Sequence, residues 1–250
     1  MGGKLILVGA GPGDPELISL KGIKALKKAD VVLYDALVHP DLLDYVNPRA
    51  EKIYVGKRAG KHSFKQEEIN ELIIEHALPG RTVVRLKGGD PFIFARGKEE
   101  LEIAETFGIE TEVIPGISSV NLPGYYGIPL TVRGINESFW VVTGTTSNGD
   151  LSKDIQLAAQ SSATVVILMG LRKLDQISTI FRSFGKGETP IAIVSKGSLE
   201  DGKAVFGTVE NIVSKKAAIE APGIIIIGDA VGTHPAFYEK VKVITEKYAA

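Results

Sequence analysis

The stretch Leu5-Ile6-Leu7-Val8-Gly9-Ala10-Gly11-Pro12-Gly13-Asp14 decides the fold of this chain. Its consecutive aliphatic residues predict a buried strand, and the glycine-rich segment that follows predicts a tight turn. Beyond the turn, apolar residues recur at helical spacing over Glu16–Ala29 and lysines occupy the remaining surface, which predicts an amphipathic helix. A strand, a turn and a helix in this order form the repeating unit of an α/β fold.

Short apolar runs of the same kind recur along the chain and alternate with helical patterns. We expect strands at Lys4–Val8, Val31–Tyr34, Lys52–Val55, Thr82–Leu86, Glu110–Ile114, Phe139–Thr143, Thr164–Leu168, Ile191–Ser195 and Ile224–Ile227. This alternation predicts α/β architecture with mostly parallel sheets. The runs at 164–168 and 224–227 have little polar interruption, so we expect them to be central strands covered on both faces.

Helix-capping residues and clusters of proline and glycine indicate where helices and domains begin and end. Ser63-Phe64-Lys65-Gln66 is typical of a capping box that opens a helix. Further helices are expected at Lys98–Phe107, Ile155–Gln160, Lys173–Phe184 and Glu210–Lys216. Proline and glycine cluster between Ile114 and Gly134, with strand signals on both sides. We therefore expect an N-terminal α/β domain at 1–114, a junction at 115–134 and a C-terminal α/β domain at 135–250.

The composition narrows the classes of function. The 250 residues include 29 Lys and Arg against 30 Asp and Glu, a net charge of −1, so no global field would draw the protein to nucleic acid or anionic lipid. The chain has no cysteine, and no stretch approaches the ~20 apolar residues of a membrane span. Its four histidines show no metal-ligand spacing. We expect a soluble cytoplasmic protein with no metal, no nucleic-acid partner and no membrane attachment.

The first glycine loop admits two interpretations. It is similar to a dinucleotide-binding turn, and Asp35 at the end of the next strand stands where an acidic residue would hold a ribose. However, Asp14 replaces the third glycine of that fingerprint, and its carboxylate would cap the helix in place of a pyrophosphate. Both a nicotinamide-dependent oxidoreductase and a turn that only packs helix on strand fit this loop.

Two further loops carry residues suited to ligand binding. Lys87-Gly88-Gly89-Asp90-Pro91-Phe92-Ile93-Phe94-Ala95-Arg96-Gly97 follows a strand, and its paired glycines and carboxylate suit either a cationic or hydroxylated ligand or a capped turn. Val55-Gly56-Lys57-Arg58-Ala59-Gly60-Lys61-His62 is cationic. With Lys87, Arg96 and Arg133 on other loops, it would form either a pocket for a polyanion or a solvated face.

In combination, these loops resemble the uroporphyrinogen-III C-methyltransferases, within the larger group of tetrapyrrole methyltransferases. The matching segments are Val8-Gly9-Ala10-Gly11-Pro12-Gly13-Asp14, Asp30-Val31-Val32-Leu33-Tyr34-Asp35, Val55-Gly56-Lys57-Arg58, Gly88-Gly89-Asp90-Pro91-Phe92-Ile93-Phe94, Pro115-Gly116-Ile117-Ser118-Ser119 and Gly127-Ile128-Pro129-Leu130-Thr131. Their order and spacing match over nearly the whole chain, so the ordered set is far more specific than one glycine loop.

The resemblance implies two α/β domains with a cofactor cleft between them, S-adenosylmethionine as cofactor with S-adenosylhomocysteine as product, and a homodimer. It implies a cofactor site lined by Pro12, Gly88, Gly89, Asp90, Ile93, Ser118, Ser119, Met169, Gly197 and Ala230. It places Asp35 and Lys57 at the family's proposed proton acceptor and proton donor positions. Because uroporphyrinogen is a polycarboxylate, we expect the basic residues to bind it: Arg58, Lys61, Arg96 and Arg133.

The residue types can be tested against this chemistry. A carboxylate beside a pyrrole can stabilise the cation that forms when a ring carbon takes the methyl group and can assist proton loss, so Asp35 is either catalytic or a solvated strand cap. Met169 either packs against adenine or belongs to the core. Val132 and Thr145 stand where the family commonly has histidine, and we expect both to influence the choice of tetrapyrrole.

The expected activity is S-adenosylmethionine-dependent C-methylation of uroporphyrinogen III at C2 and C7, which gives precorrin-2 for sirohaem or cobalamin biosynthesis. The nearest alternative is a C-methyltransferase that acts on a later precorrin. Alternatives of other classes are the nicotinamide-dependent oxidoreductase and a tetrapyrrole-binding module without turnover.

Overall fold

The computed structural model describes residues 2–56 and 64–238 of the chain, which form two compact units. The first unit is Met1–Ser119 and the second is Val120–Ala250, so the division lies within the range 115–134 that proline and glycine punctuate. The role of that range as a domain junction stays a prediction, and each unit is described by itself.

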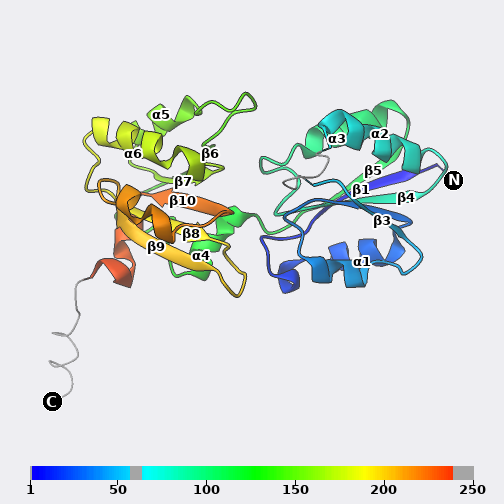
Figure 1. Ribbon diagram of the computed structural model, residues 1–250, viewed down its shortest axis with the longest axis horizontal. Coiled ribbons are helices and arrows are strands. Elements are labelled where there is room, and N and C mark those ends of the chain that lie inside the picture. Colours follow the sequence, from blue (N-terminus) through cyan, green and yellow to red (C-terminus); the bar gives the residue numbers. More distant parts are fainter. Residues whose placement is uncertain (1, 57–63, 239–250) are drawn as a thin grey trace, which may run out of the picture. The chain divides into compact units, whose positions relative to one another are not determined.

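The first unit is built on a five-stranded parallel sheet (Figure 1). Its strands are β1 (Lys4–Gly9), β2 (Val31–Tyr34), β3 (Glu51–Tyr54), β4 (Thr82–Lys87) and β5 (Glu110–Ile114). They lie in the order β3-β2-β4-β1-β5, and every neighbouring pair is parallel. The alternating pattern of the sequence is confirmed in this unit.

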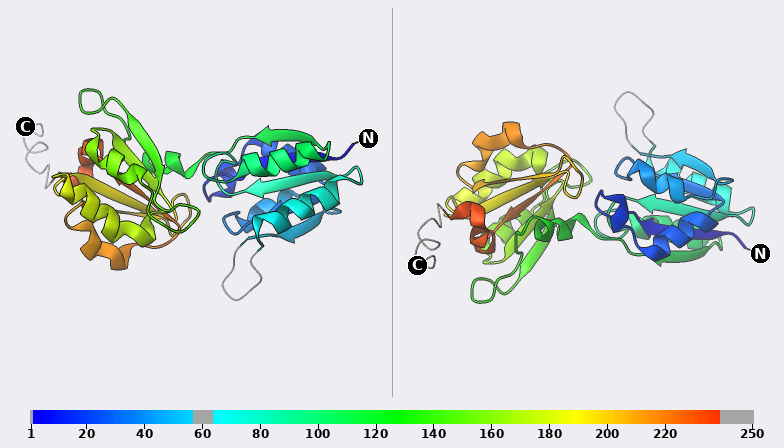
Figure 2. Two further views of the ribbon diagram at one scale, coloured as in Figure 1. Left: turned by 90° about the horizontal axis from the view of Figure 1, so that it is seen from above. Right: turned by 90° about the horizontal axis from the view of Figure 1, so that it is seen from below.

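Helices cover both faces of this sheet, as Figures 1 and 2 show. Helix α1 (Leu20–Lys28) packs on one face, and α2 (Gln66–Ala77) and α3 (Gly97–Thr106) pack on the other. Short 3-10 helices occupy Pro15–Leu17 and Pro40–Tyr45. Alternate residues of β1 and β4 therefore enter two separate layers, which explains why β1 is apolar from Leu5 to Val8.

Two helix starts differ from the sequence prediction. The helix expected over Glu16–Ala29 is interrupted, because the Ser19 hydroxyl accepts the Gly22 N–H over 3.0 Å and starts α1 afresh at Leu20. Helix α2 begins at Gln66, and the Glu68 carboxylate accepts the Lys65 N–H over 2.6 Å. Ser63, the expected cap, lies outside the described residues.

The second unit is built on a mixed five-stranded sheet. Its strands are β6 (Phe139–Thr143), β7 (Thr164–Leu168), β8 (Pro190–Ser195), β9 (Lys203–Thr208) and β10 (Gly223–Ile227). They lie in the order β6-β7-β10-β8-β9, so β7 and β10 are internal as expected. Only β6 and β7 pair in parallel.

The prediction of mostly parallel pairing is therefore wrong for the second sheet. The seven residues between β8 and β9 are too few for a parallel crossover, so these neighbours are antiparallel. Strand β10 lies between β7 and β8 and runs antiparallel to both. Strand β9 itself was not expected, because it is a half-buried edge strand without a continuous β-branched run.

Helices also cover both faces of the second sheet (Figure 2). On one face lie α5 (Asp154–Gln160) and α6 (Leu174–Ser183), and on the other lies α4 (Leu122–Tyr125). Short 3-10 helices occupy Ser119–Asn121, Leu171–Lys173, Ile212–Ala218, Asp229–Thr233 and Pro235–Phe237. The helix expected at Glu210–Lys216 is thus a 3-10 segment, displaced by two residues. Within the described ranges, the helices are all too short or too polar to cross a membrane.

Candidate functional site

Three loops meet at the carboxyl edge of the first sheet, after β1, β4 and β5. The Gly11 N–H donates to the Gly89 carbonyl oxygen over 3.3 Å, and the Gly89 N–H donates to the Gly11 oxygen over 2.7 Å. A β-carbon on Gly9 would lie 2.4 Å from the Gly116 nitrogen, a backbone atom that has no freedom to withdraw, so Gly9 must be glycine. In sheets of this kind, ligands bind in the crevice outside the carboxyl ends of the strands.

Asp90 fixes two of these loops to each other. Its Oδ1 accepts the Phe92 N–H over 2.8 Å, and its Oδ2 accepts the Gly116 N–H over 3.1 Å. Both bonds leave lone pairs on the carboxylate. Asp90 can therefore shape this edge and still accept a further hydrogen bond from a ligand.

The first glycine loop does not have the geometry of a dinucleotide site. The Ala10 N–H donates to the Lys87 oxygen over 2.8 Å and the Gly11 N–H donates to Gly89, so these amides are not available to a pyrophosphate. The Asp14 carboxylate accepts the Glu16 N–H over 2.8 Å and caps the following turn. These contacts favour the interpretation as a turn that packs the chain.

Most residues of the expected cofactor site in the first unit gather at this edge. Pro12, Gly88, Gly89 and Asp90 belong to the two bonded loops, and Ile93, which follows, is 42% exposed. Ser118 and Ser119 follow the Gly116 contact. The edge presents backbone carbonyls, a carboxylate and an exposed aliphatic side chain. These groups fit the ammonium, hydroxyl, sulfonium and apolar parts of S-adenosylmethionine.

The second unit brings together only part of its expected cofactor residues. Met169 and Gly197 follow β7 and β8, which run in the same direction on either side of β10. Ala230 follows β10, which is antiparallel to both, so it lies at the opposite edge and is fully buried. Ala230 is thus not brought together with Met169 and Gly197, and its role at the cofactor stays a prediction.

Asp35 lies at the end of β2 with its carboxylate partly buried. Its Oδ2 accepts a hydrogen bond from Arg85 Nη2 over 3.2 Å. Its Oδ1 is buried and accepts no hydrogen bond from any described residue. A buried carboxylate oxygen without a donor is costly, which makes Asp35 a candidate functional group rather than a simple strand cap.

Arg85 belongs to a buried group of charges that the sequence did not predict. The side chains of Arg85 and Lys87 on β4 and of Glu100 on α3 are each at most 5% exposed. Lys87 Nζ lies 2.8 Å from both Glu100 oxygens, and burial, followed by the Arg85 cation, lowers the pKa of Lys87. The expectation that Lys87 faces a polyanion is therefore wrong. Two cations at alternate positions of an otherwise apolar strand were the signal for this group.

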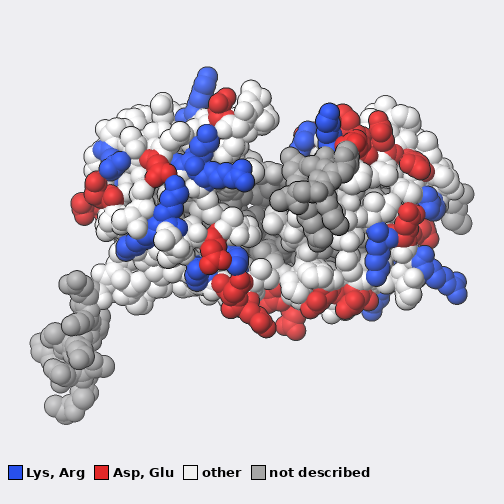
Figure 3. Space-filling model, viewed as in Figure 1, with Lys and Arg blue, Asp and Glu red and all other residues white. Residues whose placement is uncertain are grey.

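The structure describes only some of the cations that were expected to bind the substrate. Lys57, Arg58 and Lys61 lie outside the described residues. Arg96 is exposed at the start of α3 and pairs with Glu99, with Nη2 to Oε2 at 2.6 Å. Arg133 is exposed on the second unit. On the face shown in Figure 3, both signs of charge are present on each unit.

The two positions that depart from the family pattern are built into local structure. The Thr145 hydroxyl donates to the Met169 carbonyl over 2.8 Å, and Met169 has a φ of 55°, which is strained for a side chain of its size. The Val132 N–H donates to Asn136 Oδ1 over 2.9 Å. Thr145 thus holds the backbone at Met169, a residue expected to contact the cofactor.

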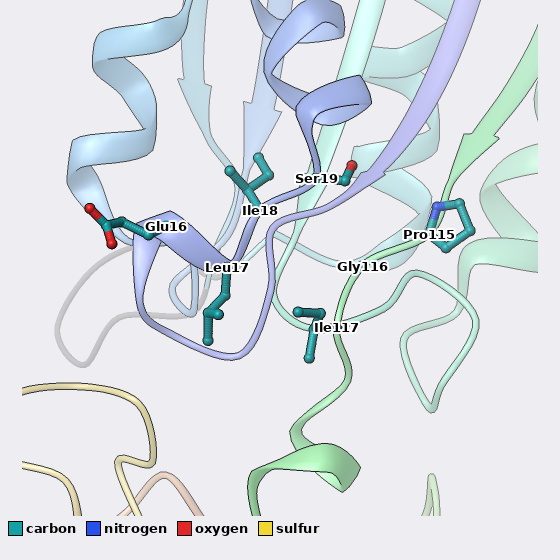
Figure 4. A pocket seen from close by; sticks show the side chains of 7 residues that line it. All are labelled: Glu16, Leu17, Ile18, Ser19, Pro115, Gly116 and Ile117. Atoms are coloured by element: carbon teal, nitrogen blue, oxygen red, sulfur yellow. The ribbon is translucent and has the colours of Figure 1, made fainter. Parts of the chain in front are cut away.

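A cavity of about 270 Å³ borders the same edge of the first unit. Figure 4 shows its lining residues, which are Glu16, Leu17, Ile18, Ser19, Pro115, Gly116 and Ile117. Gly116 belongs both to this cavity and to the Asp90 contact, so the cavity adjoins the candidate site. No group of three or more potential metal ligands occurs among residues 2–56 and 64–238.

Comparisons with known proteins place this geometry in a family. A family model described as Tetrapyrrole (Corrin/Porphyrin) Methylases matches residues 4–213. A uroporphyrinogen-III C-methyltransferase of Methanocaldococcus jannaschii is 49% identical over 236 residues, which cover 92% of this chain and 98% of that protein. Siroheme synthase 1 of Cronobacter sakazakii is 44% identical over 93% of this chain, but the match spans only 50% of that longer protein.

A solved structure matches in the same way. The uroporphyrin-III C-methyl transferase of Thermus thermophilus, complexed with S-adenyl homocysteine, superimposes with a TM-score of 0.81 at 38% identity. The match covers 93% of this chain and 100% of that chain. The family model spans most of the sequence, and both the M. jannaschii relative and this structure match over nearly their whole length. The chain belongs to the tetrapyrrole (corrin/porphyrin) methylases.

Proposed function

We propose that this protein transfers methyl groups from S-adenosylmethionine to C2 and C7 of uroporphyrinogen III and so produces precorrin-2. The observation that carries the proposal is the paired-glycine edge with Asp90 next to a partly buried Asp35 whose Oδ1 lacks a donor among the described residues. The match to a uroporphyrinogen-III C-methyltransferase over nearly the whole of both chains supports the same substrate. Family membership and the amide contacts of the first glycine loop leave the oxidoreductase without support.

The loops after β1, β4 and β5 would hold the cofactor by its polar ends. Gly88, Gly89 and Asp90 offer carbonyl and carboxylate oxygens to its donor groups, and Ile93 offers apolar surface. In the second unit, Thr145 fixes the carbonyl of Met169 at a second contact. When bound, S-adenosylmethionine supplies an electrophilic methyl group on a sulfonium sulfur. The chain then contributes chiefly by positioning, because the reacting atoms must be in line.

Asp35 would act on the charge that forms in the tetrapyrrole. A pyrrole carbon that takes a methyl group leaves its ring cationic, and the Asp35 carboxylate stabilises that cation and receives the proton that is lost. Arg85 donates to Oδ2 and so fixes the orientation of this carboxylate. Lys57 is proposed as the proton donor, and Arg58, Lys61, Arg96 and Arg133 as the cations that bind the substrate carboxylates.

We further propose that the protein acts as a homodimer in the cytoplasm, where its product enters sirohaem or cobalamin synthesis. The absence of cysteine from the whole sequence suits a reducing compartment.

The direct test is an anaerobic incubation with uroporphyrinogen III and S-adenosylmethionine, followed by mass spectrometry of the oxidised tetrapyrrole. A gain of two methyl groups is expected, with none from heat-inactivated protein. Methylation only of a later precorrin would identify the nearest alternative. A rise in melting temperature with NADH, without one with S-adenosylhomocysteine, would favour the oxidoreductase.

A further inference from the structure

The buried charges next to Asp35 form a connected set, which we call the ion cluster and define as Arg85, Lys87 and Glu100. Arg85 and Lys87 are two residues apart on β4, so their side chains point to the same face of the sheet, toward α3. Glu100 Oε1 accepts from Arg85 Nε over 3.2 Å, and both Glu100 oxygens accept from Lys87. Gln66 on α2 adds a donor at 3.3 Å.

This cluster interrupts an otherwise apolar layer. The same face of the sheet packs Leu5, Leu33 and Val83 against Leu101 and Ala104 of α3. Apolar residues of similar volume in place of a buried ion cluster are often as stable or more stable, because each ion loses its hydration. Stability alone therefore does not account for Glu100, which is completely buried.

Arg85 connects the cluster to the candidate catalytic carboxylate. Its Nε bonds Glu100, its Nη2 bonds Asp35, and its Nη1 donates to the carbonyl oxygens of Leu33 and Leu86 over 3.4 and 3.0 Å. All three nitrogens have partners, so the guanidinium plane has one orientation. The bond to Glu100 is the contact that sets this plane from the helix side, and the plane in turn sets the position of Asp35 Oδ2.

We propose that Glu100 is a positioning residue for methyl transfer, which acts through Arg85 to orient the Asp35 carboxylate. This inference rests on the proposed function of Asp35. Arg85 and Lys87 carry two positive charges, and Glu100 and Asp35 carry two negative ones, so the four side chains are balanced. Without the Glu100 charge, Arg85 and Lys87 become neighbouring buried cations that repel each other, and Arg85 loses its orientation.

The test compares Glu100→Gln with a matched control in the methylation assay. Glu100→Gln keeps the size of the side chain and removes its charge, and Glu102→Gln makes the same change on the exposed face of α3, where Glu102 pairs with Lys98. For Glu100→Gln we expect kcat to fall roughly 10- to 100-fold, while calorimetric affinity for S-adenosylhomocysteine changes by less than about twofold. Glu102→Gln is expected to behave as the wild type.

A double substitution separates positioning from general damage to the fold. If Glu100 acts through Asp35, Glu100→Gln should change the residual rate of an Asp35→Asn enzyme by less than about twofold, because the group that it orients is already disabled. An unchanged kcat in Glu100→Gln would overturn the inference. So would a double variant whose fold-loss in kcat equals the product of the two single losses.

Two further outcomes are decisive. If Glu100→Gln does not fold, Arg85→Lys serves instead, because lysine keeps the charge but cannot bond Asp35 and Glu100 in the arginine geometry. A wild-type kcat in Arg85→Lys would then overturn the inference, and a fall at unchanged cofactor affinity would support it. Absence of methylation by the wild-type protein would instead overturn the proposed function, and with it this inference.

Discussion

Asp90 and Gly116 are joined by a hydrogen bond of 3.1 Å from the Gly116 N–H to Asp90 Oδ2, which ties the loop after β4 to the loop after β5. The same carboxylate accepts the Phe92 N–H through its other oxygen. One side chain therefore defines the shape of the edge at which we place the cofactor. The two bonds also explain why a carboxylate, with two acceptor oxygens, follows the paired glycines.

Replacement of Asp90 should weaken cofactor binding. In Asp90→Ala both loop bonds are lost, and hydrogen bonds to a charged group are worth enough that affinity for S-adenosylhomocysteine should fall about 10- to 100-fold. Asp90→Asn retains one acceptor oxygen, so its affinity for S-adenosylhomocysteine should lie between those of Asp90→Ala and the wild type. Isothermal calorimetry measures the affinities, with the exposed Asp44→Ala as control. Equal affinity in Asp90→Ala and the wild type would argue against this site.

Replacement of Asp35 should impair turnover and leave cofactor binding intact. Asp35→Asn keeps the shape and a bond from Arg85 but removes the proton acceptor, so kcat should fall about 100- to 10,000-fold. Steady-state kinetics under anaerobic conditions measures this loss, and Asp44→Asn is the control. If Asp35→Asn kept more than about half of the wild-type kcat, the proton would have to leave by another route.

Loss of the Thr145 hydroxyl should loosen Met169. Thr145→Val keeps the volume but removes the donor to the Met169 carbonyl, so affinity for S-adenosylhomocysteine should fall about 2- to 10-fold. Thr106→Val removes a comparable hydroxyl, bonded over 2.8 Å to the Glu102 carbonyl on α3, and should leave the affinity unchanged. The same small change in both variants would show that Thr145 has no special role at the cofactor contact.

A surface ion pair should give a pH-dependent contribution to stability. Hydrogen bonds from Lys196 and Lys203 lower the pKa of Glu220 from 4.5 to about 2. Because the folded-state pKa is depressed, the stabilisation is present above pH 4.5 and is lost as pH falls through about 2. Glu220→Gln should therefore lower the melting temperature slightly at pH 7 and have no effect near pH 2. A difference that persisted unchanged at low pH would contradict the assignment.

The sequence predicted those parts of the fold that local patterns determine. The run from Leu5 to Val8 identified a buried strand, and Gly9 and Gly11 identified a turn, because buried strands are continuously apolar and tight turns need glycine. Pairing in the second sheet escaped prediction because direction depends on how the short turn after β8 folds back, which is not a periodic signal. Strand β9 is a half-exposed edge strand, so its sequence has no continuous apolar run that would predict it.

In the candidate site too, the residues within local motifs were predicted and the contacts between separate elements were not. Asp35, Asp90 and the glycines were identified from motifs, but Arg85 and Glu100 lie outside every motif segment, and only folding brings Arg85 Nε within 3.2 Å of Glu100 Oε1. Ala230 lies apart from Met169 and Gly197 because β10 runs against its neighbours, which moves its end to the far edge. Contacts between residues that lie apart in the sequence could therefore be identified only from the structure.

Whether this protein methylates C2 and C7 can be decided by NMR of the tetrapyrrole formed anaerobically from uroporphyrinogen III and S-adenosylmethionine labelled with ¹³C in its methyl group. We predict two labelled methyl groups in the product, one at C2 and one at C7. Labelled methyl groups at other ring positions, or no incorporation by protein that binds S-adenosylhomocysteine, would contradict it.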